Sequence, residues 1–344
     1  MKKFLSLLMA VMMMATVLTA CGGSKTEEQP ASTDGDKAQE ETQAPASTGS
    51  ELTFTTGGSS GTYYAFGSVL AGQISDCTGS KITAVEGKGS QGNIELMDMN
   101  GAQLGLVQSD VMSYAYSGTN LFAETGKVDC FSTVAALYME QVQIVTCDPS
   151  IKTVADLAGK NVSIGDSGSG VYYNAIDVLG AYGLTEEDIN PTYQGFGDSA
   201  DALKDGKIDA AFVTAGAPTT AVVDLATTKD IVVIPIDDEH AAQLMKDYPF
   251  YTKNTIPAGT YNGQDEDIAT VAVQATLIAS NDVSEDAIYE LTKALFDNLD
   301  ELKTGHPKFG ELTLENAIAG ASVKLHPGAA KYYTEQGLDV SKIS

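Results

Sequence analysis

Residues 56–64 read TGGSSGTYY and residues 164–173 read IGDSGSGVYY, and each stretch opens a similar series of strands and helices. In both, an apolar or β-branched run is followed by a Gly/Ser loop and then by two tyrosines where a helical pattern starts. Glycine lets the backbone approach a ligand, and a helix N-terminus presents unpaired N–H groups and a positive dipole end. The pair therefore predicts two half-sites that face each other across a cleft and each hold an anionic group. The alternative is that both loops are only tight turns before helices.

Short apolar runs alternate with helical patterns from residue 51 onward, and Gly or Ser marks each change. The first series predicts a strand, helix, strand, helix and strand at 52–56, 61–76, 81–86, 93–100 and 103–108. In the second series, Thr153 and Asp156 form a capping pair for a short helix. The elements expected after it are a strand at 161–165, a helix at 171–182, a strand near Thr192, a helix ended by Gly206, a strand at 208–214, a helix from Thr219 and a strand at 231–236. We expect an α/β fold with two parallel-type sheets and helices on their faces.

The N-terminus has the pattern of a lipoprotein signal. Lys2 and Lys3 precede an apolar run over 4–18, and residues 18–22 read LTACG, which resembles the bacterial lipobox whose cysteine is acylated. Residues 22–50 hold no aromatic side chain and no aliphatic one larger than Ala, so they cannot bury enough apolar area to fold. We therefore expect a signal peptide at 1–20, a disordered tether at 21–50 and an extracytoplasmic protein anchored to the cell membrane through lipid on Cys21. The alternative is a stray cysteine in an ordinary signal peptide.

The charge balance excludes one large class of partners. The chain has 46 acidic residues, 20 lysines and no arginine, with a formal net charge of −26. Nucleic acid binding needs a cationic surface, so we expect no nucleic acid partner. Without the arginine fork, any anion site must use backbone N–H groups, hydroxyls or lysine.

Cysteine, histidine and glycine motifs give weaker signals. Cys130 and Cys147 flank two apolar runs that can pair as a hairpin about residue 139, so a disulfide between them and a pair of reduced cysteines both stay open. The three histidines are not clustered, so we expect no metal. Residues 87–92, GKGSQG, match a dinucleotide-binding pattern, but they follow the second strand of a chain expected to be exported. We therefore expect no cofactor.

Eight blocks of sequence carry a family resemblance. They are TTGGSSGTYYAFG, LVQSD, TVADLAGK, IGDSGSG, GFGDSADALKDGKIDAAFVTAGAP, YPFYTKNTIPAGTYNGQDEDIATVAVQATL, YELTKALFDNLDEL and LHPGAAKYYTEQG. Together, over residues 51–338, they resemble the TAXI family, the solute-binding subunits of tripartite ATP-independent periplasmic (TRAP) transporters. The resemblance implies a type II periplasmic-binding-protein fold with hinge strands placed at 141–147 and 270–278. It implies one lobe from 51–143 and 271–344, and a second from 144–270.

The resemblance also implies a function and a site. We expect a monomeric receptor that is not an enzyme, captures glutamate, glutamine or a small dicarboxylate, and delivers it to TRAP permease subunits. The ligand-binding residues implied are Gly58, Ser60, Thr62, Tyr63, Ser90, Asn93, Gln108, Asp110, Glu140, Ser167, Ser169, Gly170, Thr214, Gly216 and Thr219. Hydroxyls and helix N-termini would hold the carboxylates, and Asp110 or Glu140 would pair an amino group. Where the family shows Thr-Gly-Gly, this chain has Gly87-Lys88-Gly89, which adds a cation near the cleft.

Two other functions fit the same sequence. Residues 57–61, GGSSG, match the G-x-S-x-G pattern of a serine hydrolase, and residues 165–168, GDSG, resemble a serine-protease nucleophile loop. Both lack the chain order that those folds need, so an exported hydrolase is the weaker reading. A lipoprotein that hands its ligand to a signalling protein would have the same sequence pattern as a transport receptor.

Overall fold

The computed structural model describes residues 49–319 and 321–343. The expected signal peptide, the lipidated Cys21 and all but the last two residues of the expected tether lie outside this range. Among the described residues, no helix is long and apolar enough to cross a membrane.

The strands form one hydrogen-bonded sheet in the order β2-β1-β3-β10-β4-β7-β5-β6, with β8 paired to β4 and β9 to β10. Their bounds are β1 Glu51–Thr55, β2 Lys81–Val85, β3 Leu104–Gln108, β4 Phe131–Thr146, β5 Asn161–Ser163, β6 Asn190–Thr192, β7 Ala210–Ala215, β8 Val232–Ile234, β9 Thr252–Ile256 and β10 Ile268–Ser280. β1 is parallel to β2 and β3, and β5 is parallel to β6 and β7. Each of the two expected series therefore supplies three parallel strands.

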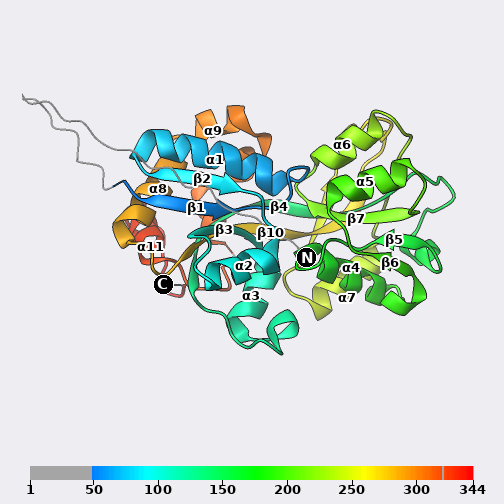
Figure 1. Ribbon diagram of the computed structural model, residues 1–344, viewed down its shortest axis with the longest axis horizontal. Helices are drawn as coiled ribbons and strands as arrows, with labels where there is room; N and C mark the ends of the chain where they lie inside the picture. The colour runs from blue at the N-terminus through cyan, green and yellow to red at the C-terminus, as the bar shows by residue number, and fades with distance from the viewer. Residues whose placement is uncertain (1–48, 320, 344) are drawn as a thin grey trace, which may run out of the picture. The chain divides into compact units, whose positions relative to one another are not determined.

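Helices cover both faces of these strands. The α-helices are α1 Thr62–Thr78, α2 Ser90–Asp98, α3 Ser109–Ser117, α4 Gly170–Ala181, α5 Phe196–Lys204, α6 Thr220–Ala226, α7 Asp238–Asp247, α8 Glu285–Asp297, α9 Leu299–Gly305, α10 Leu314–Ile318 and α11 Pro327–Glu335. The 3₁₀ helices are η1 Asn120–Phe122, η2 Val154–Leu157, η3 Glu186–Asp188 and η4 Pro307–Glu311. Figure 1 shows α1 and α9 on one side of the first three strands and α2 and α3 on the other, while α5 and α6 face α4 and α7 across β7 and β5.

Two long antiparallel strands, β4 and β10, run from one group of parallel strands to the other (Figure 1). At Gln141 and Ala272 the pairing changes: β4 continues against β7 and β8, whereas the other end of β10 pairs with β3. The expected two sheets are thus joined into one, because these strands carry their hydrogen bonds through both lobes. The crossing falls inside the expected hinges, while the lobe boundaries at 143 and 270 stay a prediction.

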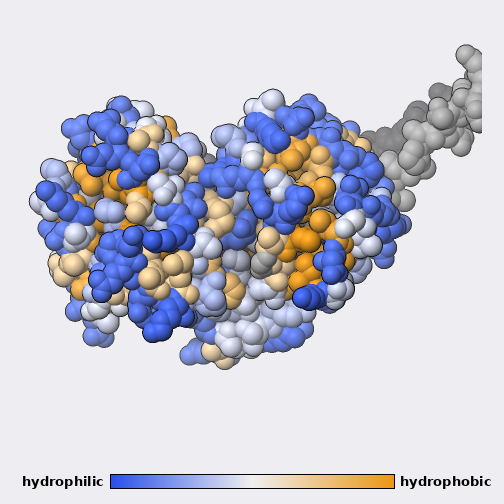
Figure 2. All heavy atoms as spheres, turned by 180° about the vertical axis from the view of Figure 1, so that it is seen from behind, coloured by the Kyte–Doolittle hydropathy of each residue, from blue (hydrophilic) through white to orange (hydrophobic). Residues whose placement is uncertain are grey.

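The apolar core is divided in the same way. In the first lobe, one cluster packs α1, α8 and α11 on one face of β1, β3 and the adjoining parts of β4 and β10. A second cluster packs α2 and α3 on the other face. In the second lobe, one cluster packs α4 and α7 against β5 and β7, and another packs α5 and α6 against β7. The structure is a two-lobed α/β fold, and seen from behind its surface is notched between the lobes (Figure 2).

Most expected elements are confirmed, including the capping box of Thr153 and Asp156 at the start of η2. Helix α3 was not among the expected elements of the first series. β3 ends at Gln108 and the backbone turns at once into α3, so Asp110 lies in a first helical turn and not at a strand end.

Of the two alternatives left open for Cys130 and Cys147, the structure has the reduced cysteines and not the disulfide. The two apolar runs between these cysteines are one continuous strand, β4, which separates the two thiols by its full length. A disulfide requires Cα atoms within about 7 Å. Cys77, Cys130 and Cys147 are all free.

Candidate functional site

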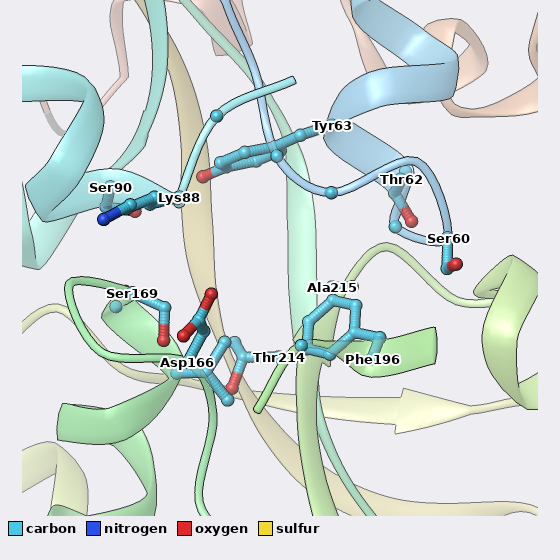
Figure 3. A pocket seen from close by; sticks show the side chains of 18 of the residues that line it. Ser60, Thr62, Tyr63, Lys88, Ser90, Asp166, Ser169, Phe196, Thr214 and Ala215 are labelled. Carbon is cyan, nitrogen blue, oxygen red and sulfur yellow. The ribbon is translucent and has the colours of Figure 1, made fainter. Parts of the chain in front are cut away.

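A cavity of about 380 Å³ lies between the lobes, where the carboxyl ends of the parallel strands meet (Figure 3). Open α/β sheets bind their ligands at this edge. Its lining residues are Gly57, Gly58, Ser59, Ser60, Gly61, Thr62, Tyr63, Glu86, Gly87, Lys88, Gly89, Ser90, Gln108, Glu140, Asp166, Ser169, Gly170, Val171, Gly195, Phe196, Gly197, Asp198, Thr214 and Ala215. Both Gly/Ser loops of the sequence repeat contribute, one from each lobe.

Four helix N-termini converge on this cavity. The residues that precede α1, α2, α4 and α5 are Gly61, Gly89, Ser169 and Gly195, and all of them line it. None of these positions makes a side-chain capping hydrogen bond, and we call the four N-termini uncapped in this sense. In the first turn of α2, the Gly92 N–H donates instead to the Gly168 carbonyl. Each N-terminus carries a positive partial charge of roughly half an elementary charge. This arrangement is suited to an anion in a chain that has no arginine.

Three buried polar atoms in the cavity wall have no hydrogen-bond partner: Ser169 Oγ, Thr214 Oγ1 and Gln108 Oε1. Their side chains are 6%, 3% and 2% exposed. A buried polar group without a partner is rare and costs free energy, so it marks a place where a further polar group binds. Figure 3 shows Ser169 and Thr214 on the second lobe, opposite Tyr63 and Ser90 of the first.

Glu140 on β4 is the buried carboxyl of the cavity. The Tyr63 hydroxyl donates a 2.7 Å hydrogen bond to Glu140 Oε2. Burial raises the pKa of Glu140 to about 8, and the hydrogen bond from Tyr63 only partly opposes that rise. Glu140 is therefore mostly uncharged at pH 7 and does not repel an anion. The other carboxylates, Glu86, Asp166 and Asp198, lie on exposed or half-buried parts of the wall.

The lobes touch each other directly around the cavity. Thr62 Oγ1 donates to the Gly216 carbonyl at 2.7 Å, Gly92 N to the Gly168 carbonyl at 3.0 Å, and Ala221 N to the Ser60 carbonyl at 3.1 Å. Each bond joins a residue of the first series to one of the second. We call this arrangement, with the lobes in contact around the cavity, the closed form.

Most of the predicted site residues line the cavity. These are Gly58, Ser60, Thr62, Tyr63, Ser90, Gln108, Glu140, Ser169, Gly170 and Thr214. Their roles in binding stay a prediction.

The remaining predicted residues lie outside the lining. Asn93 is buried and donates to the Thr56 and Leu106 carbonyls, which ties α2 to β1 and β3. Thr219 receives a hydrogen bond from Gln143 beneath α6, and the Gly216 carbonyl accepts the Thr62 hydroxyl. Ser167 is exposed on its loop. Asp110 is buried behind the wall, so Glu140 is the predicted amine partner that the cavity contains.

Sequence reasoning missed the segment from Gly195 to Asp198 at the start of α5. The signal was present in GFGDSAD, where Gly195 stands before the helix and Gly197 in its first turn, with no side-chain capping hydrogen bond, as at the other three N-termini. Lys88, noted as an added cation, is the only cationic residue in the lining and is exposed (Figure 3). Among the described residues, no group of histidine, cysteine and acidic side chains is arranged to hold a metal ion.

Two α/β lobes joined by two long strands around a polar cavity define the periplasmic-binding-protein class of folds. The chain belongs to the NMT1-like family, whose model matches residues 54–337. Among solved structures, MatC from Rhodopseudomonas palustris with bound malate is 16% identical, covers 83% of this chain and 96% of its own, and superposes with a TM-score of 0.54. A structure described as a periplasmic transporter is 15% identical, with coverages of 85% and 95% and a TM-score of 0.50. At these identities the similarity shows the fold.

Proposed function

We propose that this protein is an extracytoplasmic receptor of the TAXI class that captures a small acidic solute between its lobes and delivers it to a TRAP membrane permease. The observation that carries the proposal is the convergence of four uncapped helix N-termini on one cavity. Backbone N–H groups and helix dipoles favour carboxylates, and here they come from both lobes. One solute that touches both lobes stabilises the closed form over the open form.

The unpartnered hydroxyls of Ser169 and Thr214 add donors for the same anionic groups. The wall near Glu140 is neutral at pH 7, so a dicarboxylate or an acidic amino acid meets no buried negative charge there. The sequence blocks shared with the TAXI family support transport as the purpose of capture. Lipid on Cys21 would keep the receptor at the membrane surface, where the permease lies.

The reading as a serine hydrolase has weaker support. Ser59 and Ser60 line the cavity, but none of the chain's three histidines is among its lining residues. A hydroxyl nucleophile needs a base within hydrogen-bond reach. A sensing role stays open, because a signalling receptor and a transport receptor both capture the solute in this way.

The test is binding by the purified protein. We expect glutamate, glutamine, malate or succinate to raise the melting temperature and to keep the protein compact in solution scattering. Mass spectrometry of solute released after gentle purification identifies the natural ligand. If none of these four solutes changes the melting temperature and the released solute is not an acid, the proposed ligand class is wrong.

A further inference from the structure

A buried polar network lies directly behind the cavity and joins the two lobes. Gln108 Nε2 donates to Asn174 Oδ1 at 3.1 Å, and Asn174 Nδ2 donates to Asp110 Oδ2 at 3.2 Å and to the Tyr251 hydroxyl oxygen at 2.9 Å. The Tyr251 hydroxyl in turn donates to Asp177 Oδ2 at 3.0 Å. Gln108 and Asp110 belong to β3 and α3, whereas Asn174 belongs to α4 of the other lobe.

The chemistry of this network fixes which way each side-chain amide points. Tyr251 gives its only proton to Asp177, so its oxygen can only accept from Asn174. The Asp110 carboxylate is also an acceptor. Asn174 must therefore turn its NH₂ group toward these two acceptors and its Oδ1 toward Gln108. Gln108 is then held with its NH₂ on Asn174 and its Oε1 pointing elsewhere.

Gln108 is a lining residue of the cavity and is 2% exposed, and its Oε1 is buried without a hydrogen-bond partner. The atom occupies the space where a Cβ on Gly170, another lining residue, would be. A buried acceptor in this position binds a donor and has nothing to offer a carboxylate oxygen.

We propose that Asn174 is a positioning residue that orients Gln108 across the closed cleft, so that Gln108 Oε1 selects acidic solutes that carry a hydrogen-bond donor. The donor can be an ammonium or a hydroxyl group. The inference deepens the proposed function and rests on it. Because Asn174 and Gln108 come from different lobes, the selection acts only in the closed form, where a solute without a donor leaves Oε1 buried and unpaired.

The charges around the network are consistent with this orientation of the two side-chain amides. The titratable groups that face Asp110 are Asp177, Glu140, Tyr114 and Tyr251. Burial raises the pKa of Asp110 to about 7 and that of Asp177 to about 6. Above pH 7 both carboxylates are hydrogen-bond acceptors and hold the Asn174 and Gln108 side-chain amides in this orientation. Below pH 6 both are protonated, and the orientation is no longer fixed.

The experiment compares pairs of solutes that differ by one donor. Affinities for glutamate and glutarate, and for malate and succinate, are measured by calorimetry at pH 7.5 on the wild type and on Asn174→Leu, Gln108→Leu and Gln108→Glu. We expect the wild type to prefer at least one donor-bearing solute over its partner by about tenfold or more. Asn174→Leu and Gln108→Leu should bring that ratio close to one, and so should Gln108→Glu, because a carboxylate has no NH₂ group to donate to Asn174 Oδ1.

A matched control weakens the closed form and leaves the orientation of the Asn174 and Gln108 amides unchanged. Tyr173→Phe removes a different hydrogen bond between the lobes, from the Tyr173 hydroxyl to Gln91 Oε1 at 3.2 Å, and should lower both affinities of a pair equally. Equal affinity of the wild type for both members of each pair overturns the inference. So does an unchanged ratio in Asn174→Leu.

A readout without ligand separates failure of this inference from failure of the proposed function. The side-chain NH₂ signals of Gln108 in an NMR spectrum, assigned by their loss in Gln108→Leu, should shift in Asn174→Leu and in Asp110→Leu. If no solute binds but the signals shift as expected, the positioning role is supported and the ligand class is wrong. If the signals do not move, Asn174 does not position Gln108, whichever solute binds.

Discussion

The Tyr63 hydroxyl and Glu140 Oε2 are 2.7 Å apart and join helix α1 to strand β4 at the wall of the cavity. Tyr63 donates this hydrogen bond and so stabilises the charged form of Glu140, yet burial outweighs it and the pKa of Glu140 rises to about 8. The carboxyl therefore changes charge just above neutral pH, at the place where the solute is proposed to bind.

This shift predicts a stability effect of Glu140→Gln. The pKa of Glu140 is about 8 in the folded protein against an ordinary value of 4.5, so the folded state binds the extra proton and loses stability as pH rises from about 4.5 to 8. Glutamine keeps the protonated form's lack of charge. We expect Glu140→Gln to melt a few degrees above the wild type at pH 9 and at the same temperature at pH 4.5, as measured by calorimetry.

Glu86→Gln is the control, because it removes an exposed carboxylate from the same cavity. Its melting temperature should follow that of the wild type across the pH range. A Glu140→Gln variant that melts below the wild type at pH 9 would show that the buried carboxyl is charged and paired in the folded state.

Removing the unpartnered hydroxyls should weaken binding without weakening the fold. Ser169 Oγ and Thr214 Oγ1 make no hydrogen bond within the described structure, so Ser169→Ala and Thr214→Ala lose none in the solute-free protein. If each hydroxyl donates to a carboxylate, its loss should raise the Kd for glutamate or malate about tenfold. The measurement is calorimetric titration together with the melting temperature of the free protein.

Thr292→Ala provides the opposite result. This buried threonine lies on α8, outside the cavity, and its hydroxyl donates to the Ile288 carbonyl at 2.6 Å. Its substitution should lower the melting temperature and leave the affinity unchanged. If the cavity variants lose stability in the same way and keep their affinity, the hydroxyls are structural and do not bind solute.

A Cβ at Gly170 should block the site. It would overlap Gln108 Oε1, so Gly170→Ala must displace the Gln108 side chain and disturb its hydrogen bond to Asn174. We expect affinity to fall at least tenfold. Gly180→Ala on the same helix is the matched control, because a Cβ there meets nothing within 4 Å and the change should slightly stabilise α4. Equal affinities of the two variants would contradict a binding role for this part of the wall.

The sequence predicted the parts of the site that are local. Each Gly/Ser loop lies directly between a strand and a helix, so its position at a helix N-terminus follows from a few neighbouring residues, and Ser60, Ser169 and Gly170 line the cavity as expected. The same reasoning extended to the segment before α5 would have found Gly195, since it also precedes a helix without a capping residue.

The parts that failed depend on contacts distant in the sequence. The Asp110 side chain could face the cavity or face Asn174, and the contact between the two lobes decides which. No local sequence pattern predicts that contact. The sequence left the Cys130–Cys147 disulfide open for a related reason. A turn near residue 139 and a strand that continues through it have the same apolar pattern, and only the pairing of β4 with β10 and β7 distinguishes them.

The closed form should open when a hydrogen bond between the lobes is removed. Thr62 Oγ1 donates to the Gly216 carbonyl at 2.7 Å, and both residues are buried. Thr62→Val keeps the shape of the side chain but loses the donor, so the closed state alone loses this hydrogen bond, while the Gly216 carbonyl still accepts from Thr219 Oγ1 at 3.2 Å. A loss of about 1 kcal/mol there changes the ratio of closed to open molecules about fivefold. We expect a larger radius of gyration in solution scattering without solute, and a weaker affinity for every solute by the same factor.

Thr62→Ser keeps the donor and should behave as the wild type. A radius of gyration that does not change in Thr62→Val would mean that closure is held by the other contacts between the lobes and that this bond adds nothing to it.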